Sequence, residues 1–462
     1  MPTSDVGPKG SARRLLLAVL TTLLLVVVAD VALSLALEPY AGSTELMWSE
    51  YRKADDIDTV LVGPSTTGYG ISPQTLDAAL GSHSFNMATP GQALRDSLVS
   101  IQCAKRDHDV SRAITCIGYE TILEFPYINS SVVYTQAKCA GEPVHEALAD
   151  VFDLVTYDYY FGRIYSLSAA FPWTYDHVEL TGEAVARNVW RRLNLDTLEA
   201  AGDYARTSND EGWSYWGQGY DGYEVDYPAS HEHGTIFSSH RDAPIIDATT
   251  RALTELCQWC SDNGVDLYVI GAPYVPSVIL EYGDTYWQGM AAIQDIAESH
   301  GAHYVDLNMC TREVFDPSLS HFFNQVHLNH RGAEAAGTAI GSLVARIEAG
   351  DDISPLWHPH TEQGFAAWLE ELDYVDSLDY ATATEGDTTI VEAYARTGPS
   401  TPVAYRFELQ DADGSWREIR AWDADPRILL DAAEVAGRRI RISAHATTGG
   451  QDQDRMVEGP LA

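Results

Sequence analysis

Three short segments of the chain contain the residue types of a serine acyl-transfer site. Ser65 follows the apolar run "DTVLVG", so its hydroxyl is expected at the end of a strand, where its backbone N–H can also bind an oxyanion. In "FNMATPGQ", Gly91 can bring a bare backbone N–H close to a substrate oxygen, and Asn86 is a second candidate donor. In "FFNQVHLNHRGA", His327 is a candidate general base. Together these residues predict nucleophilic acyl transfer.

The orienting partner of His327 is the unusual feature of this set. Three positions before the histidine, where such sites usually have an acid, the chain has Asn324. Its carbonyl oxygen can accept from Nδ1–H and fix the tautomer, but it has no charge to stabilise the imidazolium. If the NH₂ group faces the ring, the wrong tautomer results, and in serine proteases an acid-to-amide change costs about 10⁴ in turnover. Asp316 and Glu120 are alternative orienting acids.

The elements that must position these residues are predicted to form a parallel sheet with helices on both faces. Near-continuous apolar runs alternate with helical stretches, which is typical of strands buried on both sides. The carboxyl ends of such strands form the ligand crevice, and the three segments fall at strand ends or lead into a helix. The expected strands are residues 58–63, 83–88, 112–118, 265–273 and 303–308, and Asn329 is expected to cap a last helix at 333–348.

The order of these segments resembles the SGNH/GDSL hydrolase superfamily. G-x-S follows the first strand, "FN-x-A-x-x-G" follows the second, and "HLNHRGA" precedes the last helix, within residues 38–122 and 241–350. The resemblance is greatest to the membrane-anchored extracytoplasmic branch that includes the teichoic-acid D-alanylation protein and the alginate O-acetylation proteins. It implies a three-layer flavodoxin-like α/β fold, with Ser65 as nucleophile, His327 as base, and the Ser65 and Gly91 backbones as oxyanion donors.

The chain departs from the family pattern at the third block. That block usually offers an Asn to the oxyanion hole, and Asn86 is the candidate that replaces it here. The residues at the end of the third strand are Tyr119, Glu120 and Thr121. Two further histidines, His321 and His330, flank His327 and are expected to be solvated.

Residues 1–37 are interpreted as a cytoplasmic tail and a transmembrane anchor. The apolar stretch 15–37 is long enough to cross a bilayer as one helix. Basic residues before it predict a cytoplasmic N-terminus, with the bulk of a single-pass plasma-membrane protein outside. They are Lys9, Arg13 and Arg14. A cleaved signal peptide, with a small-x-small site at 34–36, is the alternative. Asp30 is expected to lie near the outer headgroups.

A long insertion, residues 123–240, interrupts the sheet pattern and is expected to cover the crevice. It is rich in aromatic and acidic residues and contains helical pieces at 143–155 and 182–193. Aromatic rings stack on sugars, so three residues near its end are candidates for substrate binding: Trp213, Trp216 and Tyr220. The alternative is an insertion that folds on its own aromatic residues.

Residues 351–462 are expected to form a separate C-terminal module. Apolar and polar residues alternate with period two and Asp-Gly turns separate the runs, which predicts a small antiparallel β-sandwich at about 385–450. A helical linker near 360–376 precedes it.

The composition restricts the partners. With 67 acidic and 29 basic residues, the net charge of −38 argues against nucleic acid as a partner. Six cysteines leave any disulfide pairing open. Cys257 and Cys260 of "CQWC" fall on the apolar face of a helical pattern and are interpreted as buried apolar residues. The "HEH" at 231–233 lacks a third ligand in register, and no metal or cofactor is expected.

Two main functional hypotheses follow. The first is a membrane-anchored extracytoplasmic esterase or O-acyltransferase that acts on acyl groups of a cell-surface glycopolymer, beside a membrane acyl-donor protein. The second is a catalytically degenerate SGNH-like surface protein that binds or scaffolds envelope polysaccharide. The second rests on Asn324 and on the missing oxyanion Asn. A third hypothesis is an adhesin that depends on the C-terminal module alone.

Overall fold

The computed structural model describes residues 8–37, 42–119, 173, 177–193, 212–225, 247–372, 375, 377–448 and 455–461. The chain forms two compact units. The first combines Met1–Ser49 with Tyr127–Ala205, and the second combines Glu50–Pro126 with Arg206–Ala462. Several predictions, namely Glu120, Thr121, the helical piece 143–155 and the "HEH" at 231–233, fall outside the described residues.

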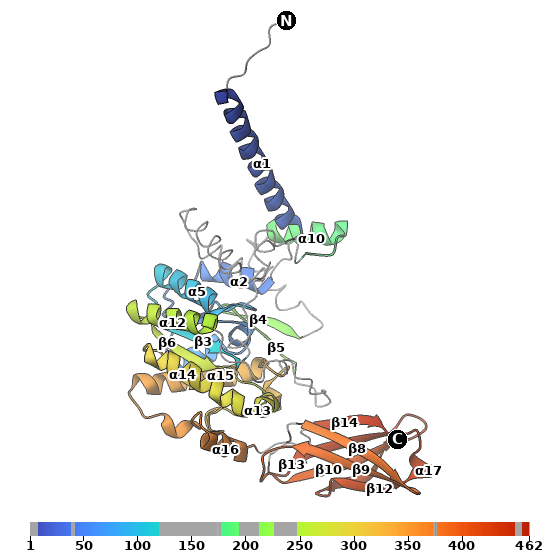
Figure 1. Cartoon of the computed structure of the whole chain (residues 1–462). Coiled ribbons are helices and arrows are strands. Elements are labelled where there is room, and N and C mark those ends of the chain that lie inside the picture. Colours follow the sequence, from blue (N-terminus) through green and yellow to red (C-terminus); the bar gives the residue numbers. More distant parts are fainter. Residues whose placement is uncertain are drawn as a thin grey trace. The chain divides into compact units, whose positions relative to one another are not determined.

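A five-stranded parallel sheet forms the centre of the second unit (Figure 1). Its strands are β1 (Thr59–Val62), β2 (Ser84–Asn86), β3 (Arg112–Ile117), β6 (Asp266–Gly271) and β7 (His303–Asp306). Their order is β2-β1-β3-β6-β7, and Val60 of β1 pairs with Phe85 on one side and Ala113 on the other. All residues of β1 and β2 are buried, as are all but the first of β3, β6 and β7. Because successive side chains point to opposite faces, both faces are covered, and the predicted α/β class is confirmed.

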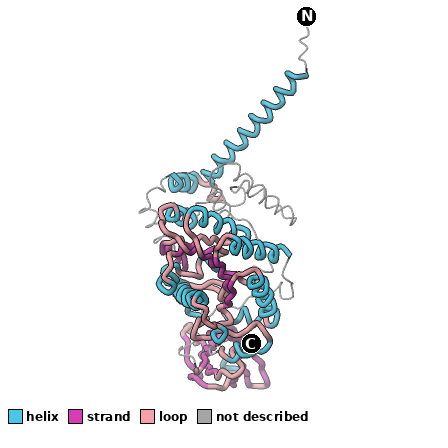
Figure 2. The backbone as a smooth tube through the Cα atoms, turned by 90° about the vertical axis from the view of Figure 1, so that its left-hand side faces the viewer, coloured by secondary structure: helices cyan, strands magenta, loops and turns pink. Residues whose placement is uncertain are grey.

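Helices on both sides of the strands supply this cover (Figure 2). They are α4 (Pro73–Leu80), α5 (Leu94–Asp107), α12 (Asp247–Asp262), α13 (Pro276–Tyr282), α14 (Asp284–Ser299) and α15 (His330–Glu348). Helix α4 packs against α15, while α12 packs against both α5 and α14. The contact of α4 with α15 depends on glycine, because a Cβ on Gly341 would lie 2.9 Å from the Leu76 carbonyl oxygen.

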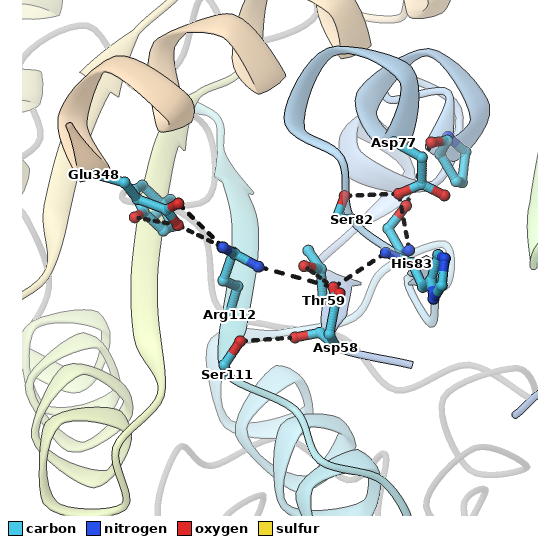
Figure 3. Close-up of polar contacts among 11 residues, drawn as sticks. Asp58, Thr59, Asp77, Ser82, His83, Ser111, Arg112 and Glu348 are labelled. Atoms are coloured by element: carbon cyan, nitrogen blue, oxygen red, sulfur yellow. Dashed lines mark hydrogen bonds and ion pairs between the residues drawn. The ribbon is translucent and has the colours of Figure 1, made fainter. Parts of the chain in front are cut away.

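A polar network holds the amino-terminal end of the sheet, opposite to the edge that carries Ser65 (Figure 3). Asp58 accepts hydrogen bonds from the Thr59 hydroxyl at 2.7 Å and from the His83 N–H at 3.1 Å. Arg112 donates from Nη2 to Glu348 at 3.0 Å and also from Nε to the same carboxylate. The hydrogen bond from Arg112 lowers the pKa of Glu348 below its usual value.

The C-terminal module is a β-sandwich that is larger than the sequence predicted. Its strands are β8 (Ser377–Glu385), β9 (Thr388–Arg396), β10 (Val403–Gln410), β11 (Trp416–Asp423), β12 (Arg427–Asp431), β13 (Arg439–Ala446) and β14 (Arg455–Pro460). They form two antiparallel sheets, β11-β10-β13-β14 and β12-β9-β8. Val391 of one sheet and Phe407 and Ile442 of the other belong to the same buried core. The short helices α16 (Glu362–Glu370) and α17 (Ala432–Val435) belong to the linker and the module respectively.

The first unit contains α1 (Pro8–Leu37) and α10 (Gly182–Leu193). Helix α10 has the bounds of the helical piece that the sequence predicted at 182–193. Ala12–Leu37 has a mean hydropathy of 2.7 and is long and apolar enough to cross a membrane. The Trp173 indole donates to Asp30 Oδ1 at 2.8 Å, so this carboxylate within α1 has a specific partner. Helix α2 (Gly42–Tyr51) contains the boundary between the two units.

Candidate active site

Ser65 lies directly beyond the carboxyl end of β1, at the first position of the short helix α3 (Ser65–Gly68). The turn that places it requires glycine, because Gly63 has a φ of +134° and a Cβ there would lie 2.3 Å from Thr67 Oγ1. Thr67 Oγ1 accepts from the Cys116 N–H of β3 at 3.1 Å, which ties α3 to the neighbouring strand. The sheet therefore fixes the direction of Ser65.

His327 lies in a tight loop that leads into α15. Phe322 and Leu328 form an isolated antiparallel bridge, so residues 322–328 turn back on themselves. Asn329 then caps α15, accepting from the Gly332 N–H at 3.0 Å, as the sequence predicted. Bridge and cap together hold the loop between the sheet edge and the helix.

Ser65, His327 and Asn324 form a continuous hydrogen-bonded chain. Ser65 Oγ lies 2.8 Å from His327 Nε2, and His327 Nδ1 lies 3.0 Å from Asn324 Oδ1. The same Oδ1 accepts from the backbone N–H groups of Val326 at 3.0 Å and His327 at 2.9 Å. Backbone N–H groups can only donate, so the amide oxygen, and not the NH₂, must face the ring. Nδ1 therefore carries the proton, and Nε2 is free to accept the serine proton.

A second loop brings Gly91 to the same edge. The Gln92 N–H donates to the Thr89 carbonyl at 3.0 Å, and Gly91 has a φ of +73°, which fits a type II turn with Pro90 before the glycine. Within the described ranges, the N–H groups of Ser65 and Gly91 donate to no protein acceptor. Both amides are therefore available to an oxyanion.

The buried Gln92 side chain joins the two loops, a role that sequence analysis did not assign. Its Oε1 accepts from the Gly63 N–H at 2.6 Å and from the Ser97 hydroxyl at 3.2 Å, while Nε2 donates to the Met87 carbonyl at 3.0 Å. The Gln92 amide thus sets the separation between the loop that carries Ser65 and the loop that carries Gly91. Its place next to Gly91 in "FNMATPGQ" was the only available signal.

Asn86 holds the scaffold of the site. Its fully buried side chain donates to the Gly68 carbonyl at 3.2 Å and accepts from the Ala88 N–H at 3.0 Å. These contacts direct the amide to the carboxyl end of α3, and its oxyanion role stays a prediction. Tyr119, which follows the third strand, is buried with its ring 4.3 Å from that of Tyr282.

Two aromatic rings flank His327, another feature that the sequence pattern did not indicate. The ring centroids of Phe323 and Tyr69 lie 5.4 Å and 5.7 Å from that of His327, and Tyr223 lies 4.1 Å from Phe323. Burial among these rings lowers the pKa of His327 to about 4, because the charged imidazolium is desolvated. The histidine is therefore a neutral base above pH 5, but an intrinsically weak one.

Tyr223 comes from a hairpin of the insertion, β4 (Trp213–Gly217) and β5 (Tyr220–Tyr223). Its turn residues, Gln218 and Gly219, have φ values of 53° and 77° and dock on β2, where the Gln218 carbonyl accepts from the Asn86 N–H at 2.8 Å. A Cβ on Gly219 would lie 2.0 Å from the Asn86 carbonyl oxygen. This close approach is what brings the end of β5 beside Tyr69 and Phe323.

The three predicted substrate-binding residues have different environments in this hairpin. Tyr220 is fully buried and its hydroxyl lies 3.1 Å from His330 Nδ1. The Trp213 indole donates to Asp221 at 2.9 Å. Trp216 is 38% exposed, with its ring stacked 3.9 Å from that of His330. His330, which was expected to be solvated, thus serves to hold the hairpin on α15.

Other candidates lie away from the catalytic chain of hydrogen bonds. Asp316 pairs with Arg312 at 2.8 Å, and its carbonyl oxygen lies 2.8 Å from His321 Nδ1. Asp316 is therefore not the orienting acid of His327. Cys257 and Cys260 are buried, and this burial raises the pKa of both thiols to about 12, in agreement with their interpretation as apolar residues.

Comparisons with known proteins do not identify a family for this chain. No family model and no curated protein matches the chain. A Ruminococcus gnavus β-glucuronidase is similar at 19% identity over 19% of this chain and 15% of its own, with a TM-score of 0.14. A gut microbial diltiazem-metabolizing enzyme is similar at 10% identity over 82% of this chain and 71% of its own, with a TM-score of 0.25. A Thermotoga petrophila endo-β-1,4-mannanase is similar at 11% identity over 90% of this chain and 93% of its own, with a TM-score of 0.14. TM-scores this low carry no argument about fold or function.

Proposed function

We propose that the chain is a membrane-anchored serine esterase or O-acyltransferase that uses a Ser65–His327–Asn324 site. The observation that carries this proposal is the hydrogen-bonded chain from Ser65 Oγ through His327 to Asn324 Oδ1, at 2.8 Å and 3.0 Å. The fixed amide orientation leaves Nε2 as the acceptor that a serine nucleophile needs. Structural roles for a serine and a histidine do not require this tautomer.

The residues support a two-step acyl transfer. Ser65 Oγ attacks the acyl carbonyl carbon while its proton passes to His327 Nε2, and the Ser65 and Gly91 N–H groups bind the resulting oxyanion. The intermediate collapses, the C–O bond to the alcohol breaks, and Nε2 returns the proton to that oxygen. Water or an acceptor hydroxyl then attacks the acyl-serine by the same route. Asn324 keeps Nδ1 protonated throughout but adds no charge.

The fold supports assignment to an SGNH-like, flavodoxin-like three-layer architecture. Counted along the chain, the strand order β2-β1-β3-β6-β7 is 2-1-3-4-5, the order of flavodoxin-like doubly wound sheets. Ligands of such sheets bind at the carboxyl edge where the strand order reverses, between the first and third strands. Ser65 follows β1 at that point.

We infer a plasma-membrane location with a cytoplasmic N-terminus, because Lys9, Arg13 and Arg14 precede the apolar segment 15–37 of α1. An acylated cell-surface glycopolymer is the substrate class that suits this location, with a membrane acyl-donor protein as partner if the reaction is transfer. The aromatic hairpin, whose Tyr223 packs on Phe323 beside His327, supports a sugar substrate, since aromatic rings can stack on pyranose faces. Trp216, stacked on His330 on one face, is still 38% exposed.

One observation favours a second function. The orienting residue is uncharged and His327 has a pKa of about 4, which describes a weak base. A degenerate SGNH-like protein that binds envelope polysaccharide would have such a site. The test is full-length protein in detergent, treated with a fluorophosphonate probe and with p-nitrophenyl acetate. We expect labelling and turnover for the wild type and for Ser299→Ala, an exposed control, and neither for Ser65→Ala. Equal rates for wild type and Ser65→Ala would favour the binding function.

A further inference from the structure

Helix α10, from the insertion, packs on the last turns of α1 within the first unit. Asn188 is buried and donates to the Ala36 carbonyl at 3.1 Å, and the Val178 N–H donates to the Leu37 carbonyl at 2.8 Å. Figures 1 and 2 both show α10 beside the carboxyl end of α1 and directed across its axis. The side of α10 that carries Asn188 therefore packs against α1.

The apolar part of α1 determines the depth at which this contact occurs. From Leu15, the first residue after the basic flank, to Ser34 the helix is about 30 Å long, which matches the hydrocarbon thickness of a bilayer. Large apolar residues from Leu15 to Val31 are exposed, whereas Ala36 and Leu37 are partly buried against the rest of the unit. The pair of Asp30 with the Trp173 indole lies at this change, where indoles commonly gather at membrane interfaces. Helix α10 therefore meets α1 at the level of the headgroups.

The exposed apolar side chains and the sequence of α10 are typical of an interfacial helix. Leu180, Trp190 and Leu193, which precede or lie in α10, are 68%, 62% and 67% exposed. The helix sequence contains three arginines and one glutamate, in a chain whose acidic residues outnumber the basic ones by 67 to 29. Charges beyond about 8 Å are screened at physiological salt, so this local excess, and not the net charge, acts on a nearby surface.

We propose that α10 is a second membrane contact, which lies in the plane of the outer headgroups with Leu180, Trp190 and Leu193 inserted. The partner is the lipid bilayer that α1 spans, and anionic headgroups complement the net positive charge of the α10 sequence. The continuity of α10 with the end of α1 selects lipid over a soluble protein partner. The proposal is independent of catalysis and rests on α1 spanning the bilayer, which carbonate extraction of the full chain tests separately.

The test compares two positions of equal exposure in full-length protein reconstituted in nanodiscs. Trp190 and Leu429, a residue of β12 in the C-terminal sandwich, are both 62% exposed. Trp190→Cys and Leu429→Cys are labelled with an environment-sensitive fluorophore, with the wild-type chain as background for native cysteines. Quenching by headgroup-labelled lipid is expected to be at least about threefold stronger at position 190, with blue-shifted emission. Water-like emission and equal quenching at both positions would overturn the proposal.

A second readout uses the unmodified chain, in case Trp190→Cys alters folding. Hydrogen exchange is compared between detergent and nanodiscs. The amides of 182–193 are expected to exchange at least about tenfold more slowly in nanodiscs that contain phosphatidylglycerol, with no change for 427–431. Identical exchange of 182–193 in both environments would likewise overturn the membrane contact.

Discussion

Asn324→Asp is the change that most directly tests how the site works. Asn324 Oδ1 already accepts from His327 Nδ1 and from two backbone N–H groups, at 2.9–3.0 Å. A carboxylate of the same shape keeps all three hydrogen bonds, and the tautomer of His327 does not change. The substitution therefore adds one thing only, a negative charge beside the ring that becomes cationic during the reaction.

The size of the effect follows from this geometry. Two unit charges about 4 Å apart attract each other by about 4 kcal/mol at an effective dielectric constant of about 20. That energy equals about 3 pKa units, so the pKa of His327 is expected to rise from about 4 to about 7. If the transition state realises most of it, turnover increases about 10²- to 10³-fold.

The assay is kcat/KM with p-nitrophenyl acetate at pH 8, where His327 is neutral in both proteins. Asn324→Ala is the companion variant, because it leaves three donors without their acceptor and should be slower than wild type. A rate for Asn324→Asp equal to or below that of the wild type, in a protein with an unchanged fold, would refute the assignment of Asn324 as the orienting residue.

Two further predictions concern the same site. Because His327 must be neutral to act, the kcat/KM of the wild type should rise with pH around a midpoint near 4 and stay level from about pH 5 to 8, and a midpoint near 7 would contradict the desolvation of the ring. Gln92→Met leaves the buried Gly63 N–H without an acceptor, so thermal unfolding should show a loss of about 1–3 kcal/mol and kcat should fall at least about tenfold. Gln410→Met, in the sandwich, should change the free energy of unfolding by less than about 0.5 kcal/mol and leave kcat unchanged. Equal effects of the two substitutions would reject the joining role of Gln92.

Much of the scaffold could be predicted from the sequence because burial on both faces of a parallel strand leaves a continuous apolar run. The five strands were each expected within a few residues of where they lie, and Asn329 was recognised as a helix cap. The pairing of Ser65 with His327 followed from the same logic, since both segments fall at one edge of the sheet. Local patterns therefore positioned residues that are 262 apart in the chain.

The environment of the pair could not be predicted, because it depends on contacts that leave no periodic signal. Tyr223 lies near the site because its hairpin docks on the Asn86 backbone of β2. Gln92 looks like any loop amide in the sequence. The orientation of the Asn324 amide, which the sequence left open, is decided by the backbone N–H groups of Val326 and His327.

Those two N–H groups also bear on why an amide can occupy this position. A carbonyl oxygen has two lone pairs, yet Asn324 Oδ1 faces three donors, a number that suits a carboxylate better than an amide. The loop is thus already shaped to hold a negative charge, since carboxylates that accept two or three N–H groups are strongly stabilised. At pH values above about 3.9, the pKa of Asp in an unfolded chain, Asn324→Asp should therefore raise the melting temperature. This gain should disappear as the pH falls below that value. A lower melting temperature at pH 7 would show that the aromatic surroundings of His327, and not the donors, determine which residue the loop accepts.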